Sequence, residues 1–125
     1  MGYESHWTGE VRISPPLTWA EIRDSRSPGL QDLKLRLTET VVDTATGQIT
    51  TVAAIGIVPL TAEAYNGYTI EEELQSLLDA HPQHEFVGAI TARGPEGNHW
   101  RYVVRDRRVE RQEARLVWPD GEELT

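Results

Sequence analysis

The stretch LKLRLTETVVDTATGQITTVAAIGIV, residues 33–58, decides the fold that this sequence can adopt. Its first part alternates leucine with polar residues and predicts a half-buried strand that runs to about Val42. The turn DTATG follows at residues 43–47, and its glycine suits a positive φ. The returning strand, residues 49–58, is apolar on both faces, so it is predicted to lie in the middle of a sheet. This long hairpin favours an antiparallel sheet as the framework of the fold.

A short helix is predicted before the hairpin. Thr18 and Glu21 have the spacing of a capping box, T-x-x-E, for a helix over about residues 19–25. The segment Ser27-Pro28-Gly29 is expected to end this helix. Its Trp19 is expected to lie in the core, because a tryptophan buries a large apolar area.

A longer helix is predicted after the hairpin. Thr69 and Glu72 repeat the capping-box spacing, and Pro82 is expected to end the helix. Its three glutamates at residues 71–73 lie in the first turn, where the helix dipole favours negative charge, so they are assigned no function. One helical stripe is apolar and consists of Ile70, Leu74, Leu77 and Leu78.

The remaining periodic segments predict four further strands, at residues 9–14, 85–93, 100–105 and 109–118. Pro15 and Pro16 are expected to end the first of these strands, because proline donates no hydrogen bond to a ladder. The acidic tail from about residue 119 is expected to be frayed.

The predicted order is therefore β-α-β-β-α-β-β-β in a single domain, residues 1–125. Its first six elements follow the ferredoxin-like, split β-α-β order. The predicted fold class is α+β: a two-layer sandwich in which an antiparallel sheet of about six strands carries two helices on one face. The alternative is a strongly curved sheet that wraps around the second helix.

The composition excludes several classes of function. The 125 residues carry a net charge of −8 and include no cysteine, which excludes disulfides, cysteine-ligated zinc, iron–sulfur clusters and thiol nucleophiles. No apolar run approaches the roughly 18 residues of a membrane helix, and the polar N-terminus is unlike a signal peptide. A cytoplasmic protein is therefore expected. The eleven arginines against one lysine are typical of a GC-rich genome.

The stretch HWRYVVRDRRVERQEARLVW, residues 99–118, raises the question of nucleic-acid binding. A three-residue loop at 106–108 would place arginines on one face of this hairpin and aromatic residues on the other, and a register error of one residue is not expected to change that. Stacking on single strands needs both kinds of side chain on the same face, so nucleic acid is an unfavoured partner. The candidate partner-binding arginines are Arg101, Arg105, Arg111 and Arg115, for an anion, an acidic partner or nucleic acid.

Three aromatic residues outside this hairpin are further candidates for partner binding. Trp7 lies in a polar segment, where it either anchors a partner or packs over the edge of the sheet. Tyr65 and Tyr68 flank Asn66-Gly67 in a loop and are expected to form a surface pair.

The pair His81 and His84 has the spacing of metal ligands, but Pro82 interrupts it. Zinc would need a further ligand such as His6 or His99, so two exposed loop histidines are expected instead. No residue is assigned to catalysis, to a cofactor or to a metal.

Two stretches carry a resemblance to known proteins: GYESHWTGEVRISPPLTWAEI, residues 2–22, and the arginine-rich stretch at residues 99–118. Together they resemble a family of small uncharacterised proteins of actinobacteria and their phages. The resemblance implies an accessory protein from a phage-like or mobile context, and it supplies no catalytic residues.

The first hypothesis is a small non-catalytic interaction module that binds a protein or a small ligand, as a monomer or a homodimer. The alternative is binding of nucleic acid or another anion through the arginine-rich hairpin. A hydrolase that uses scattered carboxylates and histidines is a third hypothesis.

Overall fold

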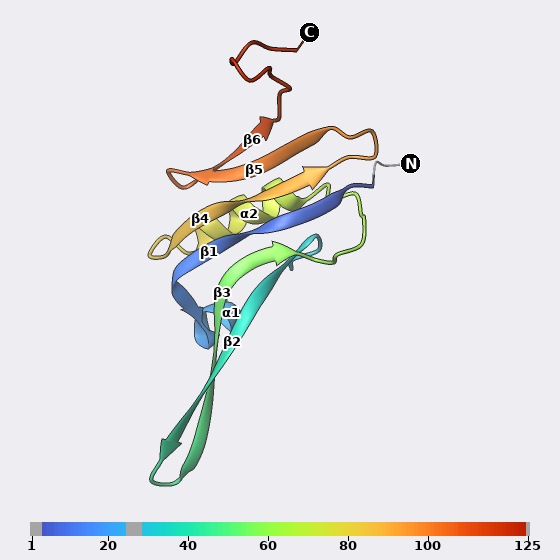
Figure 1. The fold of residues 1–125 in the computed structure, drawn as a ribbon. Coiled ribbons are helices and arrows are strands. Elements are labelled where there is room, and N and C mark those ends of the chain that lie inside the picture. Colours follow the sequence, from blue (N-terminus) through green and yellow to red (C-terminus); the bar gives the residue numbers. More distant parts are fainter. Residues whose placement is uncertain (1–3, 25–28, 125) are drawn as a thin grey trace.

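The protein, seen in a computed structural model that describes residues 4–24 and 29–124, has an α+β fold. Six strands form one antiparallel sheet in the order β2-β3-β1-β4-β5-β6 (Figure 1). Because β1 lies between β3 and β4, the first six elements have the predicted split β-α-β arrangement. The elements are β1 (His6–Thr18), α1 (Trp19–Asp24), β2 (Leu33–Thr44), β3 (Gly47–Pro59), α2 (Ile70–Ala80), β4 (Glu85–Arg93), β5 (His99–Arg105) and β6 (Arg108–Glu113).

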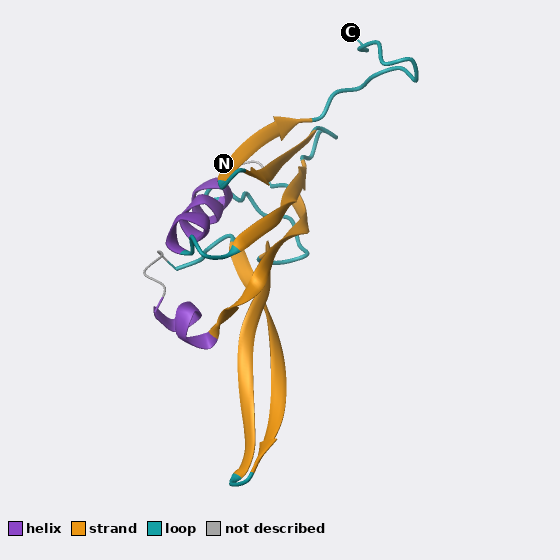
Figure 2. Ribbon diagram, turned by 90° about the vertical axis from the view of Figure 1, so that its left-hand side faces the viewer, coloured by secondary structure: helices purple, strands orange, loops and turns teal. Residues whose placement is uncertain are grey.

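Both helices cover the same face of the sheet, and the other face is open (Figure 2). The apolar stripe of α2 is fully buried, as its spacing predicted: Ile70, Leu74, Leu77 and Leu78. Alternate residues of β1 and β4 join it in the core, among them Val11, Ile13, Phe86 and Ile90. The predicted two-layer α+β architecture is therefore confirmed. No helix in the described part of the chain is long and apolar enough to cross a membrane.

The start of α1 confirms the first capping box. The Thr18 amide donates to Glu21 Oε1 at 3.1 Å, and the Glu21 amide donates to Thr18 Oγ1 at 3.2 Å. Two neighbouring predictions are wrong. β1 continues past the prolines to Thr18, with its register to β3 shifted between Arg12 and Leu17. Trp19 is 52% exposed, because Leu17 and Ile22 make the contacts of this short segment with the core. The predicted terminator, Ser27-Pro28-Gly29, falls largely outside the described residues.

The prediction of a second capping box, at Thr69 and Glu72, is wrong. Thr69 makes no side-chain cap, and its hydroxyl donates instead to Asp32 Oδ2 at 2.6 Å. The neighbouring Glu73 is buried, and its carboxylate accepts the amide of Gln31 at 2.8 Å and the amide of Asp32 at 3.1 Å. One residue of the glutamate run therefore fastens the segment before β2 onto α2, a role that the helix dipole alone did not predict.

β2 and β3 extend beyond the rest of the sheet as a projecting hairpin (Figures 1 and 2). β3 pairs with β1 only as far as Ala53, opposite Thr18. We call residues 38–52 the β2–β3 arm. All of its residues from Glu39 to Thr51 are exposed. The prediction of a central strand is therefore right for the part of β3 that lies beside β1 and wrong for the part in the arm, which has no second neighbour.

The last strand is shorter than predicted. β6 ends at Glu113, and the amide of Ala114 makes a final bond to the carbonyl of His99, the first residue of β5. Because β5 offers no partner past that point, the chain leaves the sheet. In the acidic tail, which is expected to be frayed, a β-bridge joins Val117 to Glu123, and the apolar residues Leu116, Val117, Trp118 and Leu124 are exposed.

Candidate binding site

The turn between β5 and β6 sets the positions of the candidate arginines. It consists of two residues, Asp106 and Arg107, with φ of 49° and 64°, and not of the expected three. Two-residue turns of this left-handed kind match the twist of the flanking strands. Val104 therefore pairs with Val109, and Tyr102 pairs with Arg111.

This register corrects the predicted separation of arginines from aromatic residues. A shift of one residue moves a whole strand to the other face, so the expectation that register would not matter is wrong. Arg111 lies beside Tyr102 on the helix-covered face, and Arg101 and Arg105 lie on the open face. Arg115 follows β6 and bonds Glu123 at 2.6 Å. The four candidate arginines do not form one surface.

The open face instead collects cations from five strands. By alternation and pairing, seven cations share it with three carboxylates, an excess of four on a protein of net charge −8. Some of these charges pair: Glu10 lies 3.1 Å from Arg36, and Arg105 lies 3.9 Å from Glu110. We call this set the open-face cluster; its cations are Arg12, Lys34, Arg36, Arg93, Arg101, Arg105 and Arg108, and its acids are Glu10, Glu85 and Glu110.

Trp7 is a core residue with only 4% of its surface exposed. Its ring stacks on Tyr102 at a centroid distance of 6.1 Å and meets Trp100 edge-on at 5.8 Å. Its indole Nε1 donates to the carbonyl of Tyr65 at 3.0 Å. Of the two predicted positions for Trp7, the structure places it in the packed one.

The expected surface pair of tyrosines is divided. The Tyr65 hydroxyl donates to the carbonyl of Asp32 at 2.5 Å and accepts the amide of Leu60 at 3.1 Å, and burial raises its pKa. Tyr65 therefore ties loops together. Tyr68 is 68% exposed and is the candidate aromatic residue that can meet a partner.

Tyr68 and Arg111 stand at a pocket of about 490 Å³, which we call the Tyr68 pocket. Its other lining residues include Ser5, Asn66, Asn98 and Trp100. The Arg111 guanidinium lies 5.4 Å from the centre of the Trp100 ring. Two of the lining residues, Ser5 and Trp100, carry buried donors, Oγ and Nε1, that have no hydrogen-bond partner within the described ranges.

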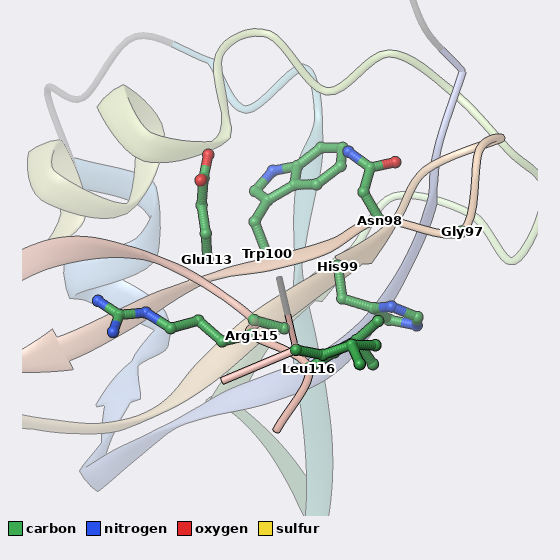
Figure 3. A pocket seen from close by; sticks show the side chains of 9 residues that line it. Gly97, Asn98, His99, Trp100, Glu113, Arg115 and Leu116 are labelled. Carbon is green, nitrogen blue, oxygen red and sulfur yellow. The ribbon is translucent and has the colours of Figure 1, made fainter. Parts of the chain in front are cut away.

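A second pocket, of about 480 Å³, lies between the start of β5 and the C-terminal tail. Figure 3 shows that Trp100 and Glu113 point to one side of the hairpin there, and that His99 and Arg115 point to the other. Because Leu116 and other tail residues form part of its wall, this pocket depends on how the tail folds.

The comparisons with known proteins give a family and no activity. A family model described as a family of unknown function (DUF6205) matches residues 1–125. The chain belongs to this family. No curated protein and no solved structure matches it. The predicted resemblance to an uncharacterised family is thereby confirmed, and a function for this DUF6205 chain has to be argued from its geometry.

The two closely spaced histidines of this DUF6205 chain are buried, which corrects the expectation of exposed residues. His84 holds the carbonyl of Pro15 and the carboxylate of Glu21, each at 2.6 Å. Hydrogen bonds from the Thr18 backbone and from His84 lower the pKa of Glu21, and burial lowers the pKa of His81. Within the described residues, no group of three or more potential ligands could hold a metal.

His6 and His99 do not complete a site with that pair. Arg93 of β4 pairs with His6 at the start of β1 on one side and with His99 of β5 on the other. His84, by contrast, contacts Pro15 near the end of β1. The His-x-x-His spacing of the DUF6205 chain therefore marks a link between β1 and the segment after α2.

Sequence reasoning missed Arg107, which joins the β5–β6 turn to the end of α2. Its guanidinium donates to the carbonyl of His84 at 2.8 Å, to that of His81 at 3.2 Å and to that of Leu78. It also lies 6.0 Å from the centre of the Phe86 ring. Nothing in the local pattern D-R-R separates Arg107 from Arg108, so no sequence signal in this DUF6205 chain marked it.

Proposed function

We propose that this DUF6205 protein is a small non-catalytic interaction module, and that the β2–β3 arm is its interaction element. The observation that carries the proposal is an exposed apolar pair in the arm, Val42 and Ile49, each about half exposed. A two-stranded ribbon is at best marginally stable in water, so an arm of this length gains stability from a partner.

The two faces of the arm differ in charge. Its charged residues are Glu39 and Asp43, and alternation places both on the face that also carries Val41. On the opposite face, Val42 pairs with Ile49 and Thr40 pairs with Thr51. We call this second face the uncharged arm face; it consists of Thr38, Thr40, Val42, Thr44, Ile49 and Thr51.

A second copy of the chain is the occupant that this face fits. Two copies of a protein with a net charge of −8 repel each other, so their contact has to avoid adding like charges. The uncharged arm face meets that condition, and a two-fold axis allows one patch to pack against itself. A basic partner would be recognised by carboxylates, which this face lacks.

The test compares two neighbouring residues on opposite faces of β2. We expect Val42→Lys to convert a dimer into a monomer, since it buries a charge in the middle of the proposed contact. Val41→Lys is the matched control, because Val41 has similar exposure on the charged face. Sedimentation velocity over a concentration series gives the association constant of each protein.

A wild-type protein that stays monomeric at the highest concentration would refute the second copy as occupant. Equal weakening by both variants would show that the uncharged arm face is not the contact. Circular dichroism of each variant shows whether the fold is kept.

The open-face cluster favours a second candidate function, the binding of nucleic acid or another polyanion. Its excess of cations lies on one side of an otherwise acidic protein, which orients a polyanion toward that side. No Trp, Tyr or Phe lies on this face among the described strand residues, so contacts would be to phosphates and not to stacked bases.

The test of this second function uses the salt dependence of binding to a fluorescent oligonucleotide. Affinity should fall steeply as salt rises, and changing Arg101 and Arg105 to Glu should abolish it. Binding that persists in the double variant would exclude the cluster as the site.

We also propose a cytoplasmic protein from an actinobacterial or phage setting. The absence of cysteine, the preference for arginine over lysine and the resemblance of the two quoted stretches support this part of the proposal. Extraction of the native protein from fractionated cells tests the location.

A further inference from the structure

The Tyr68 pocket contains donors that the fold itself does not use. Ser5 is one of the lining residues and is only 1% exposed, and its buried Oγ has no hydrogen-bond partner in the described part of the chain. The buried Nε1 of Trp100, another lining residue, likewise has no hydrogen-bond partner among the described residues. By contrast, the neighbouring Trp7 Nε1 is bonded to the carbonyl of Tyr65. Buried donors are nearly always paired, so two unused ones in one pocket point to a ligand with acceptor atoms.

The charge of the pocket agrees with an acceptor ligand. Arg111 contributes a guanidinium, and among the residues that the structure describes, none of the side chains that line the pocket is acidic. Arg111 also forms an ion pair with Glu113 at 3.3 Å, but Glu113 lies outside the lining and both side chains are exposed, so solvent screens this pair. A bound carboxylate or phosphate would therefore gain a charge-assisted hydrogen bond.

The walls of the pocket suit a flat ligand. Tyr68 offers an exposed ring, and the rings of Trp7 and Tyr102 form the buried wall. Gly67 presses on Trp7 so closely that a Cβ there would lie 2.6 Å from the indole. Since Gly67 also has a φ of +63°, a residue with a side chain would be strained at this position as well as crowded by Trp7.

We propose that the Tyr68 pocket binds a small planar anion, an aromatic ring that carries a carboxylate or a phosphate. Its ring lies against Tyr68, its anionic group meets Arg111, and its acceptor atoms take the hydrogens of Ser5 and Trp100. The volume of about 490 Å³ lies within the range of small-ligand sites. This site is separate from the β2–β3 arm and does not depend on its function.

The experiment follows the indole N–H signals of ¹⁵N-labelled protein. Four tryptophans give four such signals, and Trp100→Phe assigns the one in the pocket. The probes are indole-3-carboxylate and adenosine 5′-monophosphate, with indole and adenosine as their uncharged counterparts. We expect an anionic probe to shift the Trp100 signal, and the tighter of the two tells whether the pocket takes a carboxylate or a phosphate.

Two arginine variants of the same hairpin locate the binding. Arg111→Gln removes the proposed charge and should weaken the anionic probe about tenfold or more. Arg105→Gln is the control on the open face and should leave the affinity within about twofold of the wild type. Both residues are exposed, so both variants are expected to fold.

The proposal is wrong if no probe moves the Trp100 signal at millimolar concentration. It is also overturned if the uncharged counterparts bind as well as the anions, or if Arg105→Gln weakens binding as much as Arg111→Gln.

Discussion

Arg107 provides the sharpest test of how the β5–β6 hairpin is attached to the body of the protein. Its guanidinium donates to three carbonyls at and after the end of α2, those of Leu78, His81 and His84. Hydrogen bonds to a charged group contribute about 1.5–3 kcal/mol each, and a cation at a helix C-terminus adds about 0.3–1 kcal/mol. The side chain is exposed overall, and its bonds share one group, so these contributions do not add in full.

We therefore expect Arg107→Ala to lower the free energy of unfolding by about 2–3 kcal/mol, close to one such bond and not to three. Comparison with Arg107→Gly separates the contribution of the guanidinium hydrogen bonds from that of backbone strain. A non-glycine residue at the positive φ of 64° costs about 1–2 kcal/mol, so the loss with glycine should be smaller by about 1 kcal/mol.

Urea unfolding followed by tryptophan fluorescence measures these differences, provided that the slope with denaturant is unchanged. Arg108→Ala is the matched control, since Arg108 is the next residue and lies on the open face; it should stay within about 0.5 kcal/mol of the wild type. If Arg107→Ala were no worse than Arg108→Ala, the guanidinium would not be holding the hairpin to α2.

Three further predictions concern stability. Glu73→Gln should cost about 1–3 kcal/mol in urea unfolding, because a buried carboxylate that accepts backbone amides is lost, whereas the exposed Glu72→Gln should be nearly neutral. The lowered pKa of Glu21 means that its stabilisation is present above its ordinary value of 4.5 and is lost as pH falls through the lower folded value. When the pH is lowered below 4.5, the melting temperature should therefore fall, and it should fall less steeply in Glu21→Gln. Gly88→Ala should cost about 2–4 kcal/mol, because its φ is +138° and a Cβ would lie 2.2 Å from a backbone oxygen. Gly29→Ala, where a methyl group meets nothing within 4 Å, serves as the control, and equal melting temperatures for the two variants would contradict the prediction.

The arginine-rich hairpin shows why a candidate site can be misplaced when each of its strands is correctly predicted. The alternation within β5 put Trp100 and Tyr102 on one face, and the structure agrees. The relation of β6 to β5 depended on whether the turn has two or three residues. Because the turn has one residue fewer than predicted, Arg111 lies on the same face as the aromatic rings, and its guanidinium lies over Trp100.

The sequence by itself determined the local elements of this protein. The stripe of α2, the alternation of β4 and the capping box at Thr18 are patterns of a few residues, and short-range sterics and hydrogen bonding enforce them. The order of the elements followed from these patterns and led to the α+β fold class.

Only the tertiary structure decided which of these surfaces are used. Burial of Glu73 and His84 depends on segments more than 40 residues away, and the exposure of the β2–β3 arm depends on where β1 ends. The Tyr68 pocket likewise unites residues of β1, β5, β6 and two loops. Such contacts arise from the packing of distant segments, whose geometry no local period encodes.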